Sequence, residues 1–251
     1  MTVNRGQIEN NNAVTGLYGV GGGAYISATT ATLTNNSITG NMAGGYWGSG
    51  GGVRLSATAA TLTNNSISGN TAIGRGCGGG AVISATTAAT IINNSFTTNT
   101  ARLGGGLCLA TGSTETTYSA KLYNNLFWDN VANENQGADL LIYNDGDNDY
   151  FPSPVTLLAN NFDQAQPTGF SSTLPITLDP TNLNQIDPLF VDASTGDFHL
   201  QPGSPMIDAG YPGTPDLPEL DIEGTPRFLG ASVDIGAYEY DDGSPPRPFC
   251  S

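Results

Sequence analysis

The sequence predicts an all-β fold, a right-handed parallel β-helix with three-strand coils of about 29 residues and an irregular C-terminal cap. Three observations lead to this fold class. A Gly-Gly-Gly segment followed by alternating apolar residues occurs at residues 21–27, 50–56, 78–84 and 104–110. A second block, which begins Ala31-Thr-Leu-Thr-Asn-Asn, returns 29 residues later at Ala60, again at Ala89, and more loosely at Ala120. A fixed period of this length is typical of a solenoid, and no helical periodicity separates the blocks.

Each coil is predicted to contain three short strands, because its apolar residues alternate. In the first full coil, Ala24 and Ile26 face inward in one strand, Ala31 and Leu33 in the next, and Ile38 in the third. The equivalent inward positions of the later coils are Val53, Leu55, Ala60, Leu62, Ile67, Ala81, Ile83, Ala89, Ile91, Phe96, Leu107, Leu109, Ala120, Leu122 and Phe127. Neighbouring coils are therefore expected to pair in parallel, about 4.8 Å apart.

Asparagines recur at the predicted corners. One column, expected to form a hydrogen-bonded ladder, contains Asn41, Asn70, Asn99 and Asn130. A second expected ladder contains Asn35, Asn64, Asn93 and Asn124. An Asn amide can bond the coils above and below it and tolerates left-handed backbone angles. These residues therefore have a structural reason for their positions, and we assign them no chemistry.

The period also divides the chain. The predicted parts are regular coils at 1–135, a final coil with an acidic insertion at 136–176, a capping module at 177–241 and a tail at 242–251. Half a coil opens the first part, where Val3, Ile8 and Asn11 occupy repeat positions. In the fifth coil Asn160 aligns with either Asn124 or Asn125, and the choice decides whether Leu157 or Leu158 faces inward. The last part lacks the period, and we expect it to cover the final strand edges.

Two sets of motifs resemble known families. Gly79-Gly-Ala-Val82 and Phe96-Thr-Thr-Asn99 resemble the repeats of polymorphic outer-membrane proteins, as does Phe127-Trp-Asp-Asn130. The segments 186–192, 196–205, 207–210, 221–227 and 233–239, taken in order, resemble the choice-of-anchor Q module at the end of bacterial right-handed β-helix proteins. This second resemblance covers residues 137–240. It implies a bacterial protein of the cell surface or extracellular space and supplies no catalytic residues.

Charge is distributed unevenly along the chain. Residues 1–114 carry +3 and residues 115–251 carry −18, for a total of −15. Nucleic acid is therefore not an expected partner, since phosphate binding needs a basic stripe. No apolar run is long enough for a transmembrane segment. No signal peptide follows Met1, so we expect that any export signal was removed or lies upstream.

The three cysteines are predicted to be free thiols. Cys77 comes just before a glycine run and Cys108 lies inside the following strand, so the two do not share a column of the repeat alignment. Cys250 lies in the tail. A disulfide is the alternative interpretation.

The sequence does not favour catalysis. Glu9 is the only carboxylate before Glu115, so the regular coils hold no pair of acids for glycoside hydrolysis. His199 is the single histidine of the chain and lies in the predicted cap. A polysaccharide-degrading enzyme, with its site in the acidic C-terminal part, is kept as an alternative.

Two groups of residues are candidate ligand sites. Asp145, Asp147 and Asp149 alternate in an acidic loop and predict a calcium site, because oxygen donors on a flexible loop suit a hard cation. Its alternative is a solvated turn. Tyr46 and Trp47 lie in a loop between coils and are candidate glycan contacts, since exposed aromatic rings can stack on sugars.

The first functional hypothesis is a non-catalytic structural module of the cell surface or extracellular space: a stalk, an adhesin or a filament subunit. A glycan-binding adhesin is the second. The open first coil is expected to result from truncation of the chain, with head-to-tail self-association through that coil as the alternative. The threonine pairs at 32–34 and 61–63 also suggest an ice-binding protein as an alternative function, but residues 90–92 and 121–123 interrupt that array.

Overall fold

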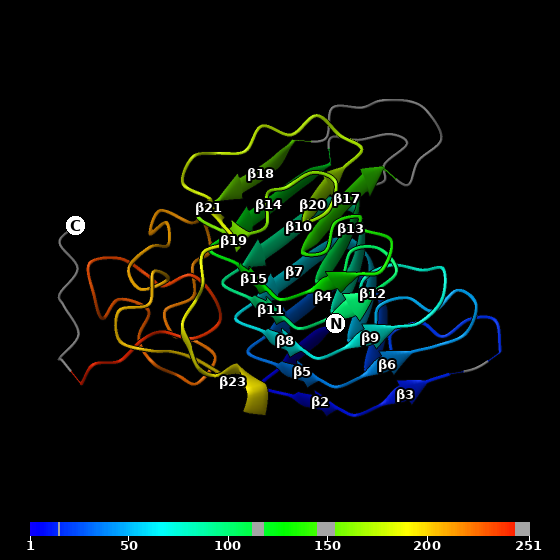
Figure 1. The fold of residues 1–251 in the computed structure, drawn as a ribbon, viewed down its shortest axis with the longest axis horizontal. Coiled ribbons are helices and arrows are strands. Elements are labelled where there is room, and N and C mark those ends of the chain that lie inside the picture. The colour runs from blue at the N-terminus through cyan, green and yellow to red at the C-terminus, as the bar shows by residue number, and fades with distance from the viewer. Residues whose placement is uncertain (15, 112–117, 145–153, 244–251) are drawn as a thin grey trace.

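The computed structural model describes residues 1–14, 16–111, 118–144 and 154–243, which form a parallel β-solenoid (Figure 1). Its coils stack through three parallel sheets, here named A, B and C. Sheet A contains β1 (Thr2–Asn4), β4 (Ala24–Thr34), β7 (Val53–Thr63), β10 (Ala81–Ile92), β13 (Leu107–Thr111), β14 (Ser119–Tyr123), β17 (Leu140–Asn144), β18 (Val155–Leu158) and β20 (Phe170–Ser172). Sheet B contains β2 (Gln7–Glu9), β5 (Ser37–Thr39), β8 (Ser66–Ser68), β11 (Ser95–Thr97), β15 (Leu126–Trp128), β19 (Asn161–Phe162) and β21 (Leu183–Asn184). Sheet C contains β3 (Asn12–Ala13), β6 (Met42–Ala43), β9 (Thr71–Ala72), β12 (Thr100–Ala101) and β16 (Val131–Ala132).

The register confirms the repeat alignment. Val3 pairs with Leu33 and Ile8 with Ile38, so the chain does open with half a coil. In sheet B, Ile67 is the register partner of Phe96. Each residue thus lies beside its sequence equivalent in the next coil.

The first and second predicted strands run together in three coils. β4, β7 and β10 are continuous strands of 11, 11 and 12 residues. The segments between the predicted strands, such as Ala28-Thr-Thr30, hold small residues without the Gly or Pro that breaks sheet pairing. In the next two coils the strands are separate, as β13 and β14 and then β17 and β18.

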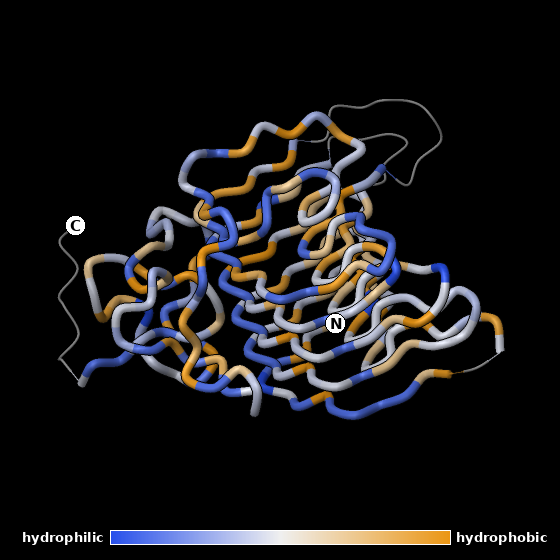
Figure 2. Tube along the Cα trace, in the orientation of Figure 1, coloured by the Kyte–Doolittle hydropathy of each residue, from blue (hydrophilic) through white to orange (hydrophobic). Residues whose placement is uncertain are grey.

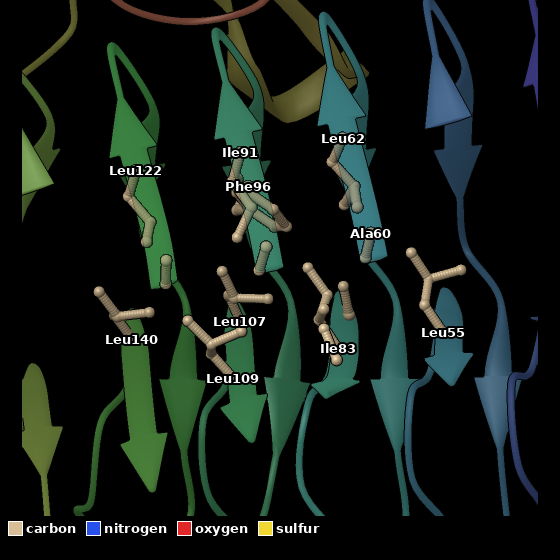
Figure 3. Packing of buried hydrophobic residues seen from close by; sticks show 14 of the residues in the cluster. Leu55, Ala60, Leu62, Ile83, Ile91, Phe96, Leu107, Leu109, Leu122 and Leu140 are labelled. Atoms are coloured by element: carbon tan, nitrogen blue, oxygen red, sulfur yellow. The ribbon is translucent and has the colours of Figure 1, made fainter. Parts of the chain in front are cut away.

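The predicted inward residues form one apolar core along the solenoid (Figure 3). Leu55, Ile83 and Leu109 are completely buried, as are Phe96 and Phe127. The rings of Phe96 and Phe127 stack with centroids 4.9 Å apart and planes 6° from parallel. Because each coil buries its apolar side chains only against its neighbours, this stack holds the coils together.

The first asparagine ladder is confirmed. Asn41 Nδ2 donates to Asn70 Oδ1 and Asn70 Nδ2 to Asn99 Oδ1, both at 3.0 Å. Asn99 Nδ2 continues to Asn130 Oδ1 at 3.1 Å. Each amide also donates to a backbone carbonyl of the preceding coil, such as Ile38 O from Asn70. The ladder satisfies backbone groups that the corner leaves unpaired inside the core.

The second ladder lies one residue later than predicted. Its continuous members are Asn36, Asn65, Asn94, Asn125, Asn160 and Asn182, each donating from Nδ2 to the next. Asn35, Asn64, Asn93 and Asn124 take the left-handed turn before each of the first four members, with φ between 51° and 57°. The predicted bonds within this column form in two pairs, from Asn64 Nδ2 to Asn35 Oδ1 at 3.0 Å and from Asn124 Nδ2 to Asn93 Oδ1 at 3.3 Å. Figure 2 shows a hydrophilic column along this edge of the solenoid, next to the C-terminal segment.

The fifth-coil register follows from this ladder. Asn125 Nδ2 donates to Asn160 Oδ1 at 2.9 Å, so Asn160 aligns with Asn125 rather than Asn124. Leu157 accordingly pairs with Leu122 and is buried, whereas Leu158 is partly exposed.

The C-terminal segment packs along the side of the solenoid, with the β22 (Phe190–Asp192) and β23 (Asp197–Leu200) hairpin and η1 (Ala193–Thr195) near its beginning (Figure 1). Asn93 Nδ2 donates to Asp234 O and Asn124 Nδ2 to Tyr211 O, so this segment contacts middle coils. The beginning of the segment does cover a final strand edge, since β21 pairs with β19, whereas its later part lies against the side of the solenoid. Leu174 is buried in the apolar core, and Ile176 and Leu178 pack against it.

The part of the chain that the structure describes contains no helix that could span a membrane.

Candidate functional site

A groove of about 710 Å³ runs along the outer face of sheet A, beside the loops that lead from sheet C back to sheet A. Its walls come from several coils, so no single repeat builds it. The lining residues are Tyr18, Val20, Tyr25, Trp47, Ser49, Arg54, Arg75, Gly76, Cys77, Leu103, Gln136, Leu141, Tyr143 and Thr173. Four of them are aromatic and two are arginines, a composition unlike the Asn, Thr and Ser that dominate the coil surfaces.

Strand alternation positions the residues on the sheet side of the groove. Because Ala24 and Ile26 face the core, Tyr25 between them points outward. Tyr25 on β4 is the register partner of Arg54 on β7. The same outward column continues through Val82, Cys108 and Leu141. A parallel sheet thus sets Tyr25 and Arg54 side by side, one strand spacing apart.

The loop side of the groove is also held by backbone pairing. Val20 forms a parallel bridge with Ser49, and Trp47 forms an antiparallel bridge with Gly74. Trp47 N also donates to Leu17 O at 2.9 Å, which links this loop to the loop of the preceding coil. Successive loops therefore stack on each other as the strands do, and Trp47 is fixed at its backbone.

The aromatic side chains remain open to solvent. Tyr18 is 63% exposed, Tyr25 54% and Trp47 44%. Exposed aromatic groups that gather in one hollow mark a binding surface more often than scattered ones do. Of the predicted pair Tyr46 and Trp47, only Trp47 is among the residues that line the groove. The Tyr46 ring packs edge-on against the Trp47 ring, with centroids 5.1 Å apart.

Two arginines give the groove a positive charge. Arg54 Nη1 donates to Ser49 Oγ at 2.7 Å, and the Arg75 guanidinium lies 4.6 Å from the centroid of the Tyr46 ring. No Asp or Glu is among the described residues that line the groove. The repeat period did not identify Arg54, Arg75, Tyr18 or Tyr143 as residues of a binding site.

A disulfide borders the groove, which corrects the prediction of free thiols for Cys77 and Cys108, whereas Cys250 lies outside the described residues. Cys77 and Cys108 are bonded, with Cα atoms 6.0 Å apart. Cys77 lies at the corner before β10, and Cys108 lies outward on β13 of the next coil. The alignment compared only positions within one column, whereas this bond joins a corner of one coil to a strand of its neighbour. With Val82 and Leu141, the buried Cys108 forms a small apolar cluster beneath the groove.

The other candidate residues lie elsewhere. Asp145, Asp147 and Asp149, the predicted calcium ligands, fall outside the described residues. In the described ranges, no group of three or more His, Cys, Asp or Glu side chains is placed to hold a metal ion. His199 Nδ1 lies 2.6 Å from Asp197 Oδ1, and its Nε2 lies 3.0 Å from Glu223 Oε2. These contacts tie β23 to the turn that contains Glu223.

A second hollow, of about 520 Å³, lies over the middle of β4, β7 and β10. It is lined by the Ser-Ala-Thr steps of the repeats at 27–29, 56–58 and 84–86, together with Ala110. It offers neither an aromatic ring nor a charge, so the aromatic groove is the stronger candidate.

Comparison of the chain with family models, with curated proteins and with solved structures gives no match.

Proposed function

We propose that the chain is an extracellular β-solenoid module that binds carbohydrate in the aromatic groove and performs no reaction there. The observation that carries this proposal is the set of solvent-open rings of Tyr18, Tyr25 and Trp47 in one hollow. The apolar face of a pyranose packs against an aromatic ring, and ligand sites typically combine such surfaces with a few polar groups. Ser49, Gln136 and Thr173 supply neutral polar groups along the same walls.

The disulfide supports the location. Disulfides persist in secreted and surface proteins and are rare in the cytosol, where thiols are kept reduced. The Cys77–Cys108 bond therefore favours an oxidising compartment. Stacked parallel sheets and continuous asparagine ladders provide a rigid scaffold on which a groove keeps its shape.

The composition of the groove supports binding rather than degradation. Glycoside hydrolysis requires two carboxylates on either side of the scissile bond. The described residues that line the groove include no carboxylate. The ice-binding hypothesis loses support as well. Thr63, the second threonine of its pair, and Ile92 at the equivalent position of the next coil are buried rather than open to solvent.

A glycan array probed with the full chain tests the proposal. We expect binding to a subset of glycans and at least a tenfold loss of affinity in the Trp47→Ala variant. Tyr211→Ala is the matched control, since Tyr211 is 43% exposed and lies outside the groove. Its binding is expected to equal that of the wild type. Absence of binding to every glycan, or equal losses in both variants, would overturn the proposal and leave a passive structural module.

A further inference from the structure

Building on the proposed carbohydrate-binding function, we infer that the ligand of the groove is an anionic polysaccharide whose carboxylate or sulfate groups pair with Arg54 and Arg75. Both side chains line the groove together with its aromatic residues. A guanidinium stays charged at every physiological pH and presents five N–H donors that match an acid group. The groove thus offers the chemistry of an acidic sugar rather than of a neutral one.

Arg54 and Arg75 form no ion pair with an acidic side chain that the structure describes. Among the described residues, Arg102 pairs with Glu134 at 2.6 Å and Arg227 with Glu239 at 3.3 Å. No carboxylate in those ranges pairs with Arg54 or Arg75. Arg5 and Lys121 also lack a carboxylate partner in the described ranges, but Arg54 and Arg75 lie together in one hollow. We expect an acid group of the ligand to form an ion pair with each of these guanidinium groups.

Contacts with neutral groups hold both guanidinium groups in place. The bond from Arg54 Nη1 to Ser49 Oγ uses one N–H group and leaves others free to donate. Arg75 rests on the Tyr46 ring, a cation–π contact that preserves its charge. Because the side chains are already oriented, binding an anion costs less conformational entropy.

The surrounding charge favours an anion on this face. The coils that contribute most of the groove lie within residues 1–114, which carry +3, and most of the acidic residues lie in residues 115–251. Interactions between exposed charges are largely screened beyond about 8 Å at physiological ionic strength. The acidic part of the chain therefore repels a ligand in this groove only weakly.

The solvent-open aromatic rings favour a sugar, whose apolar face stacks on them, and the small number of cations disfavours a nucleic acid. A single-stranded nucleic acid needs a positive groove that follows its backbone over several nucleotides. Two arginines can pair with one or two acid groups. Uronate or sulfated sugar residues of a polysaccharide carry such groups.

Affinity measurements with the full chain test this inference. The probes are polygalacturonate, its methyl ester as the uncharged match, a sulfated polysaccharide, a neutral galactan and a single-stranded oligonucleotide. We expect at least tenfold tighter binding of an acidic polysaccharide than of the neutral probes, weakening as salt rises. The comparison of polygalacturonate with the sulfated probe shows which acid group is preferred.

Variants separate the two proposals. We expect Arg54→Gln/Arg75→Gln to lose at least tenfold in affinity for the acidic probe and to lose the preference for that probe over its methyl ester. Arg5→Gln, which removes an exposed arginine outside the groove, is expected to have no effect. Equal binding of the acid and its ester overturns the anionic class but leaves carbohydrate binding intact. Failure of every polysaccharide, or tighter binding of the oligonucleotide, overturns the inference, and both proposals are overturned when the glycan array shows no binding either.

Discussion

Arg227 Nη2 donates to Asn64 Oδ1 at 2.7 Å, across 163 residues of the chain. The guanidinium is completely buried, and it also contacts Ala237 O and Glu239 Oε2. Asn64 occupies the left-handed corner of a middle coil, so this bond attaches the C-terminal segment to the side of the solenoid. Burial and the nearby Asp234 carboxylate raise the pKa of Glu239, and Arg227 acts in the opposite direction.

Replacing this arginine is expected to destabilise the protein strongly. Arg227→Met removes the donor to Asn64 and leaves Glu239 buried without its cation, a change that costs about 3–5 kcal/mol in other proteins. Urea denaturation of the variant measures the loss. Arg102→Met is the control, because its pair with Glu134 is partly exposed and such pairs contribute below about 1 kcal/mol. Similar losses in the two variants would contradict the role assigned to Arg227.

Phe96 provides a test of core packing that uses the repeat itself. Phe96→Ala is expected to cost about 3–5 kcal/mol, because it opens a cavity beside the Phe127 ring. Phe96→Ile is the matched control, since the register partner Ile67 shows that Ile fits this position of a coil. We expect its cost to be clearly smaller. Equal costs, measured by denaturant titration, would show that the stacked rings contribute more than the volume that they fill.

The disulfide is expected to stabilise the solenoid because it lowers the conformational entropy of the unfolded chain. It closes a loop with a sequence separation of 31 residues, for which chain entropy predicts about 3–4 kcal/mol. Denaturation with and without reductant measures this contribution. Cys250→Ala should respond to reductant like the wild type, and the double variant Cys77→Ala/Cys108→Ala should not respond. A reductant effect that survives in the double variant would assign the stabilisation to another cause.

The regular coils were predictable because the repeat period and the strand alternation indicate the same fold there. The period fixed the parallel stack, and strand alternation identified inward residues such as Leu55 and Phe96. The paired Asn-Asn steps were harder, because the period alone does not say which Asn faces the core. The last coils show which Asn of each step faces the core. At the equivalent positions Ala159-Asn160 and Thr181-Asn182 keep only the second Asn, and this second Asn is the ladder member.

The groove and the disulfide were less accessible to sequence reasoning, for a geometric reason. Tyr25 and Arg54 follow strand alternation, so their adjacency was visible in the repeat alignment. Tyr18 and Arg75 come from loops of unequal length, which have no period to align. The side-on packing of the C-terminal segment depends on single long-range contacts, such as that of Asn93 with Asp234, which leave no local pattern.

His199 gives a pH-dependent prediction, because its ring lies between Asp197 and Glu223. Burial by itself lowers the pKa of His199, but hydrogen bonds to Glu223 and Asp197 raise it, and the net shift is upward from 6.5. The folded protein therefore binds this proton more tightly than the unfolded chain does. The resulting stabilisation is fully present below pH 6.5 and is lost as the pH rises through the folded-state pKa.

NMR titration tests this directly, because His199 is the only histidine and its ring signals need no assignment among others. We expect a pKa above 6.5 in the wild type and a lower value in Glu223→Gln, which keeps the size of the side chain but removes its charge. Glu134→Gln is the control, since Glu134 pairs with Arg102 instead. A wild-type pKa at or below 6.5, or one that Glu223→Gln leaves in place, would show that the two carboxylates do not hold the imidazolium.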